Sequence, residues 1–366
     1  MTPVPDRILT QHALTGQWLS HALPLGNLSY GPELNGPGSL SGTLSPRLLA
    51  QNPTLIDPGT TLIYAEAAGQ IQWGGLIWHT EMEGSDLRLE AASWSSYLQK
   101  RRDLDGNYGG RGPYTNGDPC QVIRDIWAYA QSIPDGNLGV VVDSTTSSAK
   151  VGTPAEPHKS LFWEKPVLGD AVDDLVSGAA TPDYTCTSEW NAAKTDVIRR
   201  IRLGWPRLGA RRTDITFSSG VNIIDEPPVE MAADEYAQVV IAAGAGDGSA
   251  KPFEISAVRN GRLRLEHLLD LPEIKGRDIL ASRASAERAR RQNMKSVDQI
   301  TIRNTSAAPF GAWQVGDDVY TRVNNAWTSY VGWRRITGWV TEPHAPGGPR
   351  AVIDLKPADS YEYGGV

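Results

Sequence analysis

The chain has 366 residues, more than one hydrophobic core usually organises, which favours two to four domains. Its 42 acidic residues outnumber the 35 basic ones, and the formal charge of -7 disfavours wholesale binding to nucleic acid or to an anionic membrane. With 37 glycines, 25 prolines and 40% apolar residues, the composition indicates a folded protein with many turns and argues against disorder and against a helical bundle.

The amino-terminal segment lacks the pattern of a secretory leader, because no cationic stretch precedes an apolar one. No apolar run approaches the ~18 residues that a membrane-spanning helix needs. The two cysteines, Cys120 and Cys186, are too few and too far apart for a disulfide framework or a metal knuckle. We therefore expect a protein without a membrane span that folds in the reducing cytoplasm of a bacterium.

Residues 1–104 are expected to form an antiparallel β domain. Between Leu14 and Arg102, short runs of alternating apolar residues are separated by glycine and proline, a pattern typical of strands. Gly74 and Gly75 are expected to place a bulge in the middle of one strand. Nine residues are expected on the one buried face of the sheet: Leu62, Tyr64, Ile71, Trp73, Leu76, Trp78, Leu87, Leu89 and Ala91.

A small insert with one helix and one strand is expected at residues 118–158. It follows the glycine-rich segment Asp103–Gly117, which has no apolar periodicity and is expected to be a long exposed loop at a domain boundary. An aspartate followed by a proline predicts the start of a helix over 118–132. The sequence LGVVVDS then predicts a short buried strand, and the polar residues 144–159 predict a linker. The helix has its apolar residues at helical spacing: Val122, Ile123, Ile126, Trp127 and Ala130.

A mixed domain of strands and helices is expected at residues 159–294. One helix is expected over Leu168–Ala179, and another over Gly276–Gln292, whose alanine and arginine content favours helix. Strands are expected in the segments Tyr184–Asn191, Val197–Trp205, Asp214–Ile224, Ala237–Gly246 and Phe253–Asn260.

The last domain, residues 295–366, is expected to be a small β-barrel. The turn-rich segment Pro309–Asp318 lies between its first two strands. The whole chain is thus predicted to be α+β and mainly antiparallel β. No tandem repeat is visible, which leaves open that the two large β portions are distant duplicates. The strands of the last domain are expected in Asp298–Thr305, Asp317–Asn324, Trp333–Glu342 and Ala351–Pro357.

The sequence predicts no catalytic residue, no metal site and no cofactor. No serine lies in a G-x-S-x-G motif, and no histidine has a second histidine or a cysteine three or four residues away. Cys120 has an activating context at a predicted helix start, yet we expect it to pack rather than to react. The six scattered histidines are His12, His21, His79, His158, His267 and His344.

Four carboxylate doublets are expected to be solvated turns or caps, because neighbours on a strand point to opposite faces and cannot form a catalytic pair. The GAGDG sequence at residues 244–248 has a superficial likeness to a phosphate-binding turn. It lacks the rest of that motif and is expected to be a loop between two strands. The doublets are Asp173-Asp174, Asp225-Glu226, Asp234-Glu235 and Asp317-Asp318.

Two basic stretches stand out in this acidic chain, Arg199–Arg212 and Arg277–Arg291. Their arginines suit phosphates or carboxylates, and we favour carboxylates of a neighbouring subunit. Twelve tryptophans against four phenylalanines also favour assembly, since tryptophan is enriched at subunit interfaces.

The chain resembles the baseplate-hub type of minor tail protein found in siphophages of actinobacteria. The resemblance depends on the order of several motifs along nearly the whole chain. These are a strand with Trp73, Gly74 and Gly75, then Tyr97, Leu98 and Arg101, the helix over 118–132, the turn at 244–248, and Val315, Gly316 and Asp317.

The resemblance implies a homotrimer in which two tube-like β domains per subunit, at 1–104 and 159–294, build a pseudo-sixfold ring. Such a ring would close the distal end of the tail tube at the virion tail tip and serve as a platform and a channel for genome ejection. The implied partners are the distal tail protein and tail tube, the tape measure protein in or near the lumen, other minor tail or tip-fibre proteins, and DNA in passage. The implied protein is not an enzyme.

Two alternatives remain open at this stage. A tail-associated carbohydrate-binding or cell-wall-degrading protein would need two carboxylates across a tryptophan-lined groove. A DNA-binding head-tail connector would hold phosphates through Arg199–Arg212.

In a hub, net acidity would let DNA slide through the channel, and exposed loops such as Asp103–Gly117 would contact the host.

Overall fold

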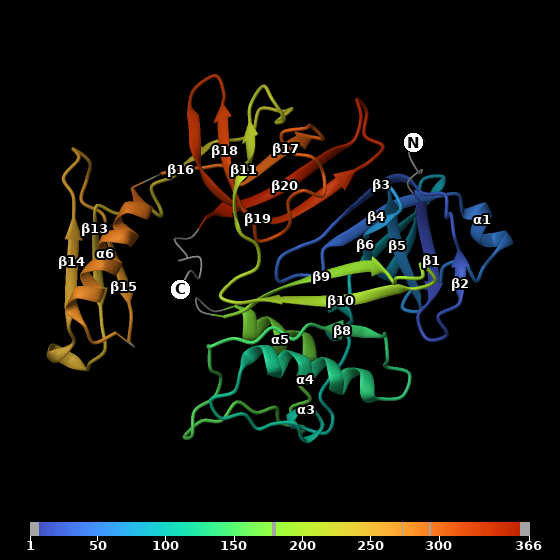
Figure 1. Ribbon diagram of the computed structural model, residues 1–366, viewed down its shortest axis with the longest axis horizontal. Helices are drawn as coiled ribbons and strands as arrows, with labels where there is room; N and C mark the ends of the chain where they lie inside the picture. Colours follow the sequence, from blue (N-terminus) through green and yellow to red (C-terminus); the bar gives the residue numbers. More distant parts are fainter. Residues whose placement is uncertain (1–6, 178–180, 273, 293, 359–366) are drawn as a thin grey trace.

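The computed structural model describes residues 7–177, 181–272, 274–292 and 294–358 of the chain. Strands dominate over helices, and most strand pairs are antiparallel, which confirms the predicted fold class at that level. Figure 1 shows the amino-terminal strands on the right, the helical insert below them, the carboxy-terminal strands above, and a small module standing apart on the left. No described helix is long and apolar enough to cross a membrane.

The amino-terminal strands have cores on both faces rather than the single buried face predicted from the sequence. Leu62 and Tyr64 belong to one core, whereas their neighbours Ile63 and Ala65 belong to another. The continuous apolar run TLIYA reflects this, since a strand that is covered on both sides needs no polar face. The strands are β1 (Arg7–His12), β2 (Trp18–Ser20), β3 (Gly26–Gly31), β4 (Ser39–Leu44), β5 (Thr61–Ala67), β6 (Gln70–Glu83) and β7 (Asp86–Ala92), with short helices α1 (Pro46–Gln51) and α2 (Ser95–Leu98).

The predicted bulge at Gly74 and Gly75 is wrong. These two glycines pair in register with β5, and the irregular positions of β6 lie on either side of them, at Gln72 and Trp78. The two glycines instead let neighbouring segments of the chain approach the backbone of β6 closely. A Cβ at Gly74 would lie 2.5 Å from the Ser188 Oγ, and one at Gly75 would lie 2.4 Å from the Ala92 carbonyl oxygen.

The helical insert packs directly on the amino-terminal strands. Helix α4 (Pro119–Ser132) confirms the prediction, and its capping residue Asp118 accepts a hydrogen bond from the Cys120 amide. The second predicted helix begins at Leu168 as expected, whereas its predicted last residues, Gly178 and Ala179, lie outside the described residues. The other elements here are α3 (Asn107–Gly110), α5 (Leu168–Val176) and a three-stranded sheet of β8 (Val140–Val142), β10 (Val197–Gly204) and β9 (Asp183–Trp190).

The carboxy-terminal strands do not close into a barrel among the described residues, contrary to prediction. They continue the amino-terminal sheet, because Thr341 pairs with Tyr30, and the twelve-stranded sheet has edges on both sides. The chain after one edge strand meets the strand at 299–303 at the isolated bridge between Ile223 and Ile302 and through two backbone hydrogen bonds, at 2.9 and 3.0 Å, on either side of that bridge. These strands are β11 (Arg211–Ser218), β17 (Gln299–Arg303), β18 (Asp318–Asn324), β19 (Ser329–Glu342) and β20 (Arg350–Pro357).

Residues 237–292 form a small module with its own core. Helix α6 (Arg277–Arg291) covers one face of a three-stranded sheet, of which the third strand was not predicted. The GAGDG sequence lies in the loop between the first two strands, as predicted. The strands are β13 (Val239–Ala243), β14 (Phe253–Ala257) and β15 (Glu266–Asp270), and the antiparallel pair β12 (Glu230–Met231) and β16 (Lys295–Ser296) joins the module to the rest of the chain.

Candidate interaction surface on the helical insert

The segment Asp103–Gly117 is exposed at eight of its fifteen residues, as predicted, but it is an ordered turn built around a buried carboxylate. The Asp103 side chain is fully buried and accepts hydrogen bonds from the amides of Asp105, Gly106 and Tyr108 at 2.8–3.2 Å. These bonds hold Tyr108 in a left-handed conformation, with φ of 55°. Non-glycine residues adopt that conformation only where surrounding contacts enforce it.

An aromatic cluster fixes this turn to the polar segment 144–159. The rings of Tyr108, Tyr114 and His158 lie 6.1–6.5 Å apart, and the Tyr114 amide donates to the His158 carbonyl at 2.8 Å. Burial lowers the pKa of His158, so its imidazole is neutral near pH 7, and burial raises the pKa of Tyr108 to about 12. The segment expected to be a linker is thus part of the packed insert.

Two apolar side chains, Phe162 and Trp163, lie exposed beside this turn at Gly106, and we name them the insert patch. Phe162 and Trp163 are 53% and 64% exposed and meet edge to face, with ring centroids 5.1 Å apart. Exposed aromatic residues gathered on an ordered support are typical of a surface that binds a partner. Sequence reasoning had no signal for this patch, because LFWEKP is indistinguishable from an apolar run that packs inside.

Cys120 packs in the core of the insert, as predicted. Burial and the nearby Asp118 carboxylate raise the pKa of the Cys120 thiol to about 11, which disfavours the thiolate that nucleophilic chemistry needs. Burial also raises the pKa of Cys186, whose Sγ contacts the Ser95 hydroxyl.

The histidines lie apart in the structure as in the sequence. His79 and His267 each face a single carboxylate, at 3.3 Å and 3.8 Å, and His12 accepts backbone hydrogen bonds in a turn. Within the described part of the chain, no group of three or more His, Cys, Asp or Glu side chains is placed to hold a metal ion.

One of the four carboxylate doublets is buried, which corrects the prediction that all of them are solvated. Asp317 and Asp318 are almost fully inaccessible. Asp318 pairs with Arg207 at 2.5 Å, and Asp317 accepts from the Ala210 amide at 2.9 Å and pairs with Arg212 at 3.4 Å. The other three doublets are exposed, as predicted.

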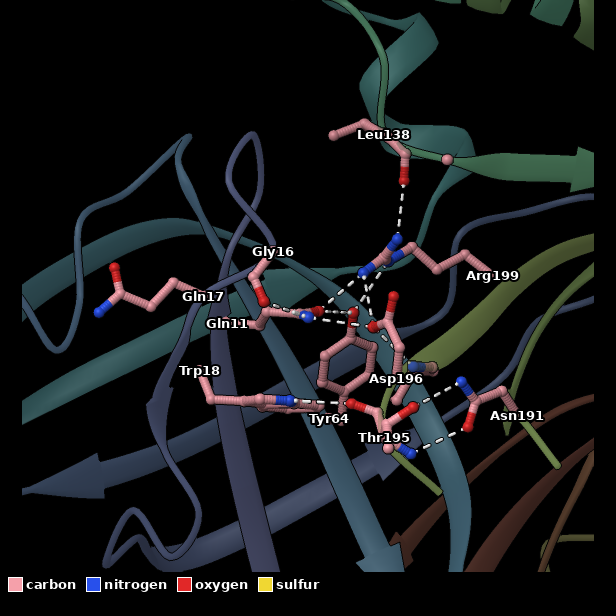
Figure 2. A network of polar contacts seen from close by, with 12 residues as sticks. Gln11, Gly16, Gln17, Trp18, Tyr64, Leu138, Asn191, Thr195, Asp196 and Arg199 are labelled. Carbon is pink, nitrogen blue, oxygen red and sulfur yellow. Dashed lines mark hydrogen bonds and ion pairs between the residues drawn. The ribbon is translucent and has the colours of Figure 1, made fainter. Parts of the chain in front are cut away.

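The basic stretch Arg199–Arg212 meets carboxylates and hydroxyls of its own chain, which corrects the assignment of these arginines to a neighbouring subunit. Figure 2 shows the Arg199 guanidinium between β1, β5 and the insert. It donates to the Gln11 Oε1 at 2.7 Å, the Tyr64 hydroxyl at 2.9 Å and the Leu138 carbonyl at 3.1 Å. This buried network joins the insert to the first sheet.

A second buried charge cluster joins the insert side of the molecule to the carboxy-terminal strands. Asp183 on β9 pairs with Arg335 on β19, and the same carboxylate accepts from the Leu208 amide at 2.9 Å. The neighbouring pair of Arg207 and Asp318 extends the cluster to β18. Burial raises the pKa of the Asp318 carboxyl above its ordinary value, and the adjacent guanidinium groups offset part of this rise. Sequence reasoning missed both clusters.

A tryptophan-lined cleft of about 380 Å³ lies beside β1 and β5 and bears on the carbohydrate alternative. Trp18 and Trp190 face it, with ring centroids 5.8 Å apart. Among its described lining residues, Glu66 is the one carboxylate, and it is held by Arg7 and by the Trp190 indole N–H at 3.2 Å. The cleft therefore lacks the two facing carboxylates that glycoside hydrolysis requires.

Comparisons with known proteins relate this fold to phage tails. The sequence matches no protein-family model and no curated protein. The 43 kDa tail protein of prophage MuSo2 from Shewanella oneidensis has a similar structure, with a TM-score of 0.55 at 11% identity, over 96% of this chain and 98% of that one. The tail protein from Neisseria meningitidis MC58 gives 0.54 at 12% identity, over 97% of each chain.

A third solved structure extends this likeness. Prophage tail protein gp18 from Listeria monocytogenes EGD-e gives a TM-score of 0.52 at 9% identity, over 95% of this chain and 94% of that one. At such identities the likeness establishes the fold and leaves function to be argued. The chain therefore has a fold that phage tail proteins share from end to end.

Proposed function

We propose that the chain is a structural subunit of a bacteriophage tail, at its baseplate or tip. The observation that supports this is the extent of the match. Three tail proteins align with 95–97% of this chain, and the alignment spans 94–98% of theirs. A match of whole chains supports a shared architectural role more strongly than a match of one domain, since single domains recur in unrelated functions.

The finer proposal is a hub of three copies that closes the distal end of the tail tube and lets DNA pass. It is in keeping with the whole-chain likeness to tail proteins, and the two buried charge clusters join the insert and both parts of the large sheet into one body. The tail tube and distal tail protein would bind on one side, tip proteins on the other, and the tape measure protein in the lumen.

Electron microscopy of tails tests this proposal. Antibodies raised against the chain are expected to label the distal end of each tail, and mass measurement of the assembled protein is expected to give three copies. Labelling at the junction of head and tail would contradict the hub, and a solitary copy in the virion would contradict the ring.

The same material tests the two alternatives. Lysis of host cell walls by the purified protein, followed as a fall in turbidity, would favour the wall-degrading function. We expect none, because Glu66 has no second carboxylate across its cleft among the described lining residues. Retention on DNA at low salt would favour the connector, and we expect little, because the stretch Arg199–Arg212 is engaged with carboxylates of this chain.

A further inference from the structure

The module at residues 237–292 is joined to the rest of the chain by a narrow connection. The chain enters it through residues 230–235 and leaves it through residues 294–296, and we name these two segments the neck. The remaining described residues, 7–177, 181–229 and 297–358, form the body. In Figure 1 the module stands apart from the body, and β16 of the neck lies between them.

The two ends of the neck are anchored in separate cores. On the body side, Val229 and Val297 flank the neck and are buried in the core of the carboxy-terminal strands. On the module side, Tyr236 is 5% exposed, its hydroxyl accepts from the Asn260 amide at 2.5 Å, and its ring centre lies 5.5 Å from the Arg262 guanidinium. Each part of the molecule therefore fixes its own end of the neck.

The neck itself has no core. None of the residues described in it, 230–235 and 294–296, is buried. Its strands β12 and β16 pair at two positions, and the Ala232 amide donates to the Met294 carbonyl at 3.0 Å just beyond them. A two-stranded ribbon without a covering layer is only marginally stable in water, so it bends and twists at little cost.

Few bonds fix the direction in which the module points. The hydrogen bonds and ion pairs that join the module to other described residues end at Glu235, Tyr236 and Met294, in the neck or next to it. On the body side, the Lys295 ammonium of the neck donates to the Ser329 carbonyl on β19 at 2.9 Å. Two packed units are expected to move relative to each other unless a large apolar interface holds them together.

We propose that the neck is a hinge on which the module turns as one rigid unit relative to the body. The module keeps its shape, because Leu280 and Ala284 on α6 pack on Val240 and Ala242 of its sheet. The backbone angles change in the neck alone, as in other hinges where a few residues at the ends of elements absorb the motion. Such motions take microseconds to milliseconds. The hinge concerns a single copy of the chain and does not depend on the proposed tail function.

Distances between paired spin labels on the full chain test the hinge. Ser282→Cys/Lys356→Cys places one nitroxide on α6 and the other on β20, so the distance crosses the neck. Two matched pairs each keep one of these sites: Ser282→Cys/Ala257→Cys lies within the module, and Lys356→Cys/Asn324→Cys lies within the body. All four positions are exposed, and the native cysteines are buried and stay unlabelled.

Double electron–electron resonance on the frozen protein gives the spread of each distance. The pair across the neck is expected to give a distribution at least about twice as wide as either matched pair, because only that distance changes when the module turns. Lys295→Ala is expected to widen the distribution further, since it removes the bond to Ser329. Lys251→Ala, which removes a lysine bond to Asp270 inside the module, is expected to leave it unchanged.

Two results would overturn the hinge. A distribution across the neck as narrow as those of the matched pairs would show that the neck holds the module in one direction. A distribution within the module as wide as the one across the neck would show that the module is loosely packed and does not turn as a unit. Neither result bears on the tail function, which electron microscopy of tails tests separately.

Discussion

Arg199 shows how much of this protein's stability depends on single buried charges. Its guanidinium donates to Gln11, Tyr64 and Leu138, and the most distant of these, Gln11, lies 188 residues away in the sequence. A buried ion whose donors are satisfied costs little, whereas removing it takes one hydrogen-bond donor from each of its partners in the core. Arg199 therefore joins the insert to the first sheet through directed hydrogen bonds rather than through buried apolar area.

Removal of Arg199 is expected to lower the free energy of unfolding by about 1–3 kcal/mol, because Arg199→Ala leaves the Leu138 carbonyl without this donor, while Tyr64 and Gln11 keep only the hydrogen bond to each other. Urea denaturation measures the change. The neighbouring Arg200 is the matched control, since it pairs with the mostly exposed Glu189, and Arg200→Ala is expected to cost less than about 1 kcal/mol. Equal losses in the two variants would contradict the role given to Arg199.

Glu287 is expected to make the module sensitive to acid. Hydrogen bonds from Arg290 and Arg291 lower its pKa to about 2 from an ordinary value of 4.5. Because the folded pKa lies below the unfolded one, the stabilisation is fully present above pH 4.5 and is lost as pH falls toward 2. The loss has a ceiling of about 3 kcal/mol.

Urea denaturation at pH 5 and at pH 3 measures this effect. Glu287→Gln is expected to unfold with a smaller difference between the two pH values than the native chain. Glu266→Gln, at an exposed pair with Arg264 in the same module, is expected to keep the native difference. The native difference persisting in Glu287→Gln would contradict this account.

Helix α4 was predictable because everything that defines it is local. The cap at Asp118, the proline after it and the apolar spacing all lie within fifteen residues. The turn after Asp103 was not predictable. An aspartate among glycines is usually solvated, and only the folded chain brings three amides onto its carboxylate. The same holds for the insert patch, whose exposure depends on what packs around it.

The glycines of β6 illustrate the same difference between local and distant causes. A glycine pair inside a strand indicates either a bulge or close approach of another chain segment, and sequence does not distinguish the two. The answer here depends on Ala92 at the end of β7 and on Ser188 in β9, which is more than 100 residues away. The sequence therefore indicates that Gly74 and Gly75 have a structural role, but it does not show that this role is close approach rather than a bulge.

Gly75→Ala is expected to destabilise the protein by about 1–3 kcal/mol, because its Cβ would lie 2.4 Å from the backbone oxygen of Ala92, which cannot rotate away. Thermal unfolding followed by circular dichroism measures the loss. Gly338 in β19 is the matched control, since a Cβ there would meet its nearest atom at 3.4 Å. Comparable losses at the two glycines would contradict the close-approach explanation.

At the scale of the molecule, the chain consists of a body and an appended module. The body has a twelve-stranded sheet, the three-stranded sheet beside the insert, and two buried charge clusters that join these parts. The module has a separate core of five buried residues, and the chain enters and leaves it side by side, with the Ala232 amide donating to the Met294 carbonyl at 3.0 Å. This arrangement makes the module removable.

Replacing residues 233–293 with Asn-Gly is expected to turn β12 and β16 into a hairpin, because those strands already pair antiparallel and that dipeptide favours the required turn. The shortened chain is expected to keep the melting temperature of the body to within about 3 °C, as calorimetry would measure, since no body core residue is lost. A shortened chain that melts far lower would show that the module supports the body.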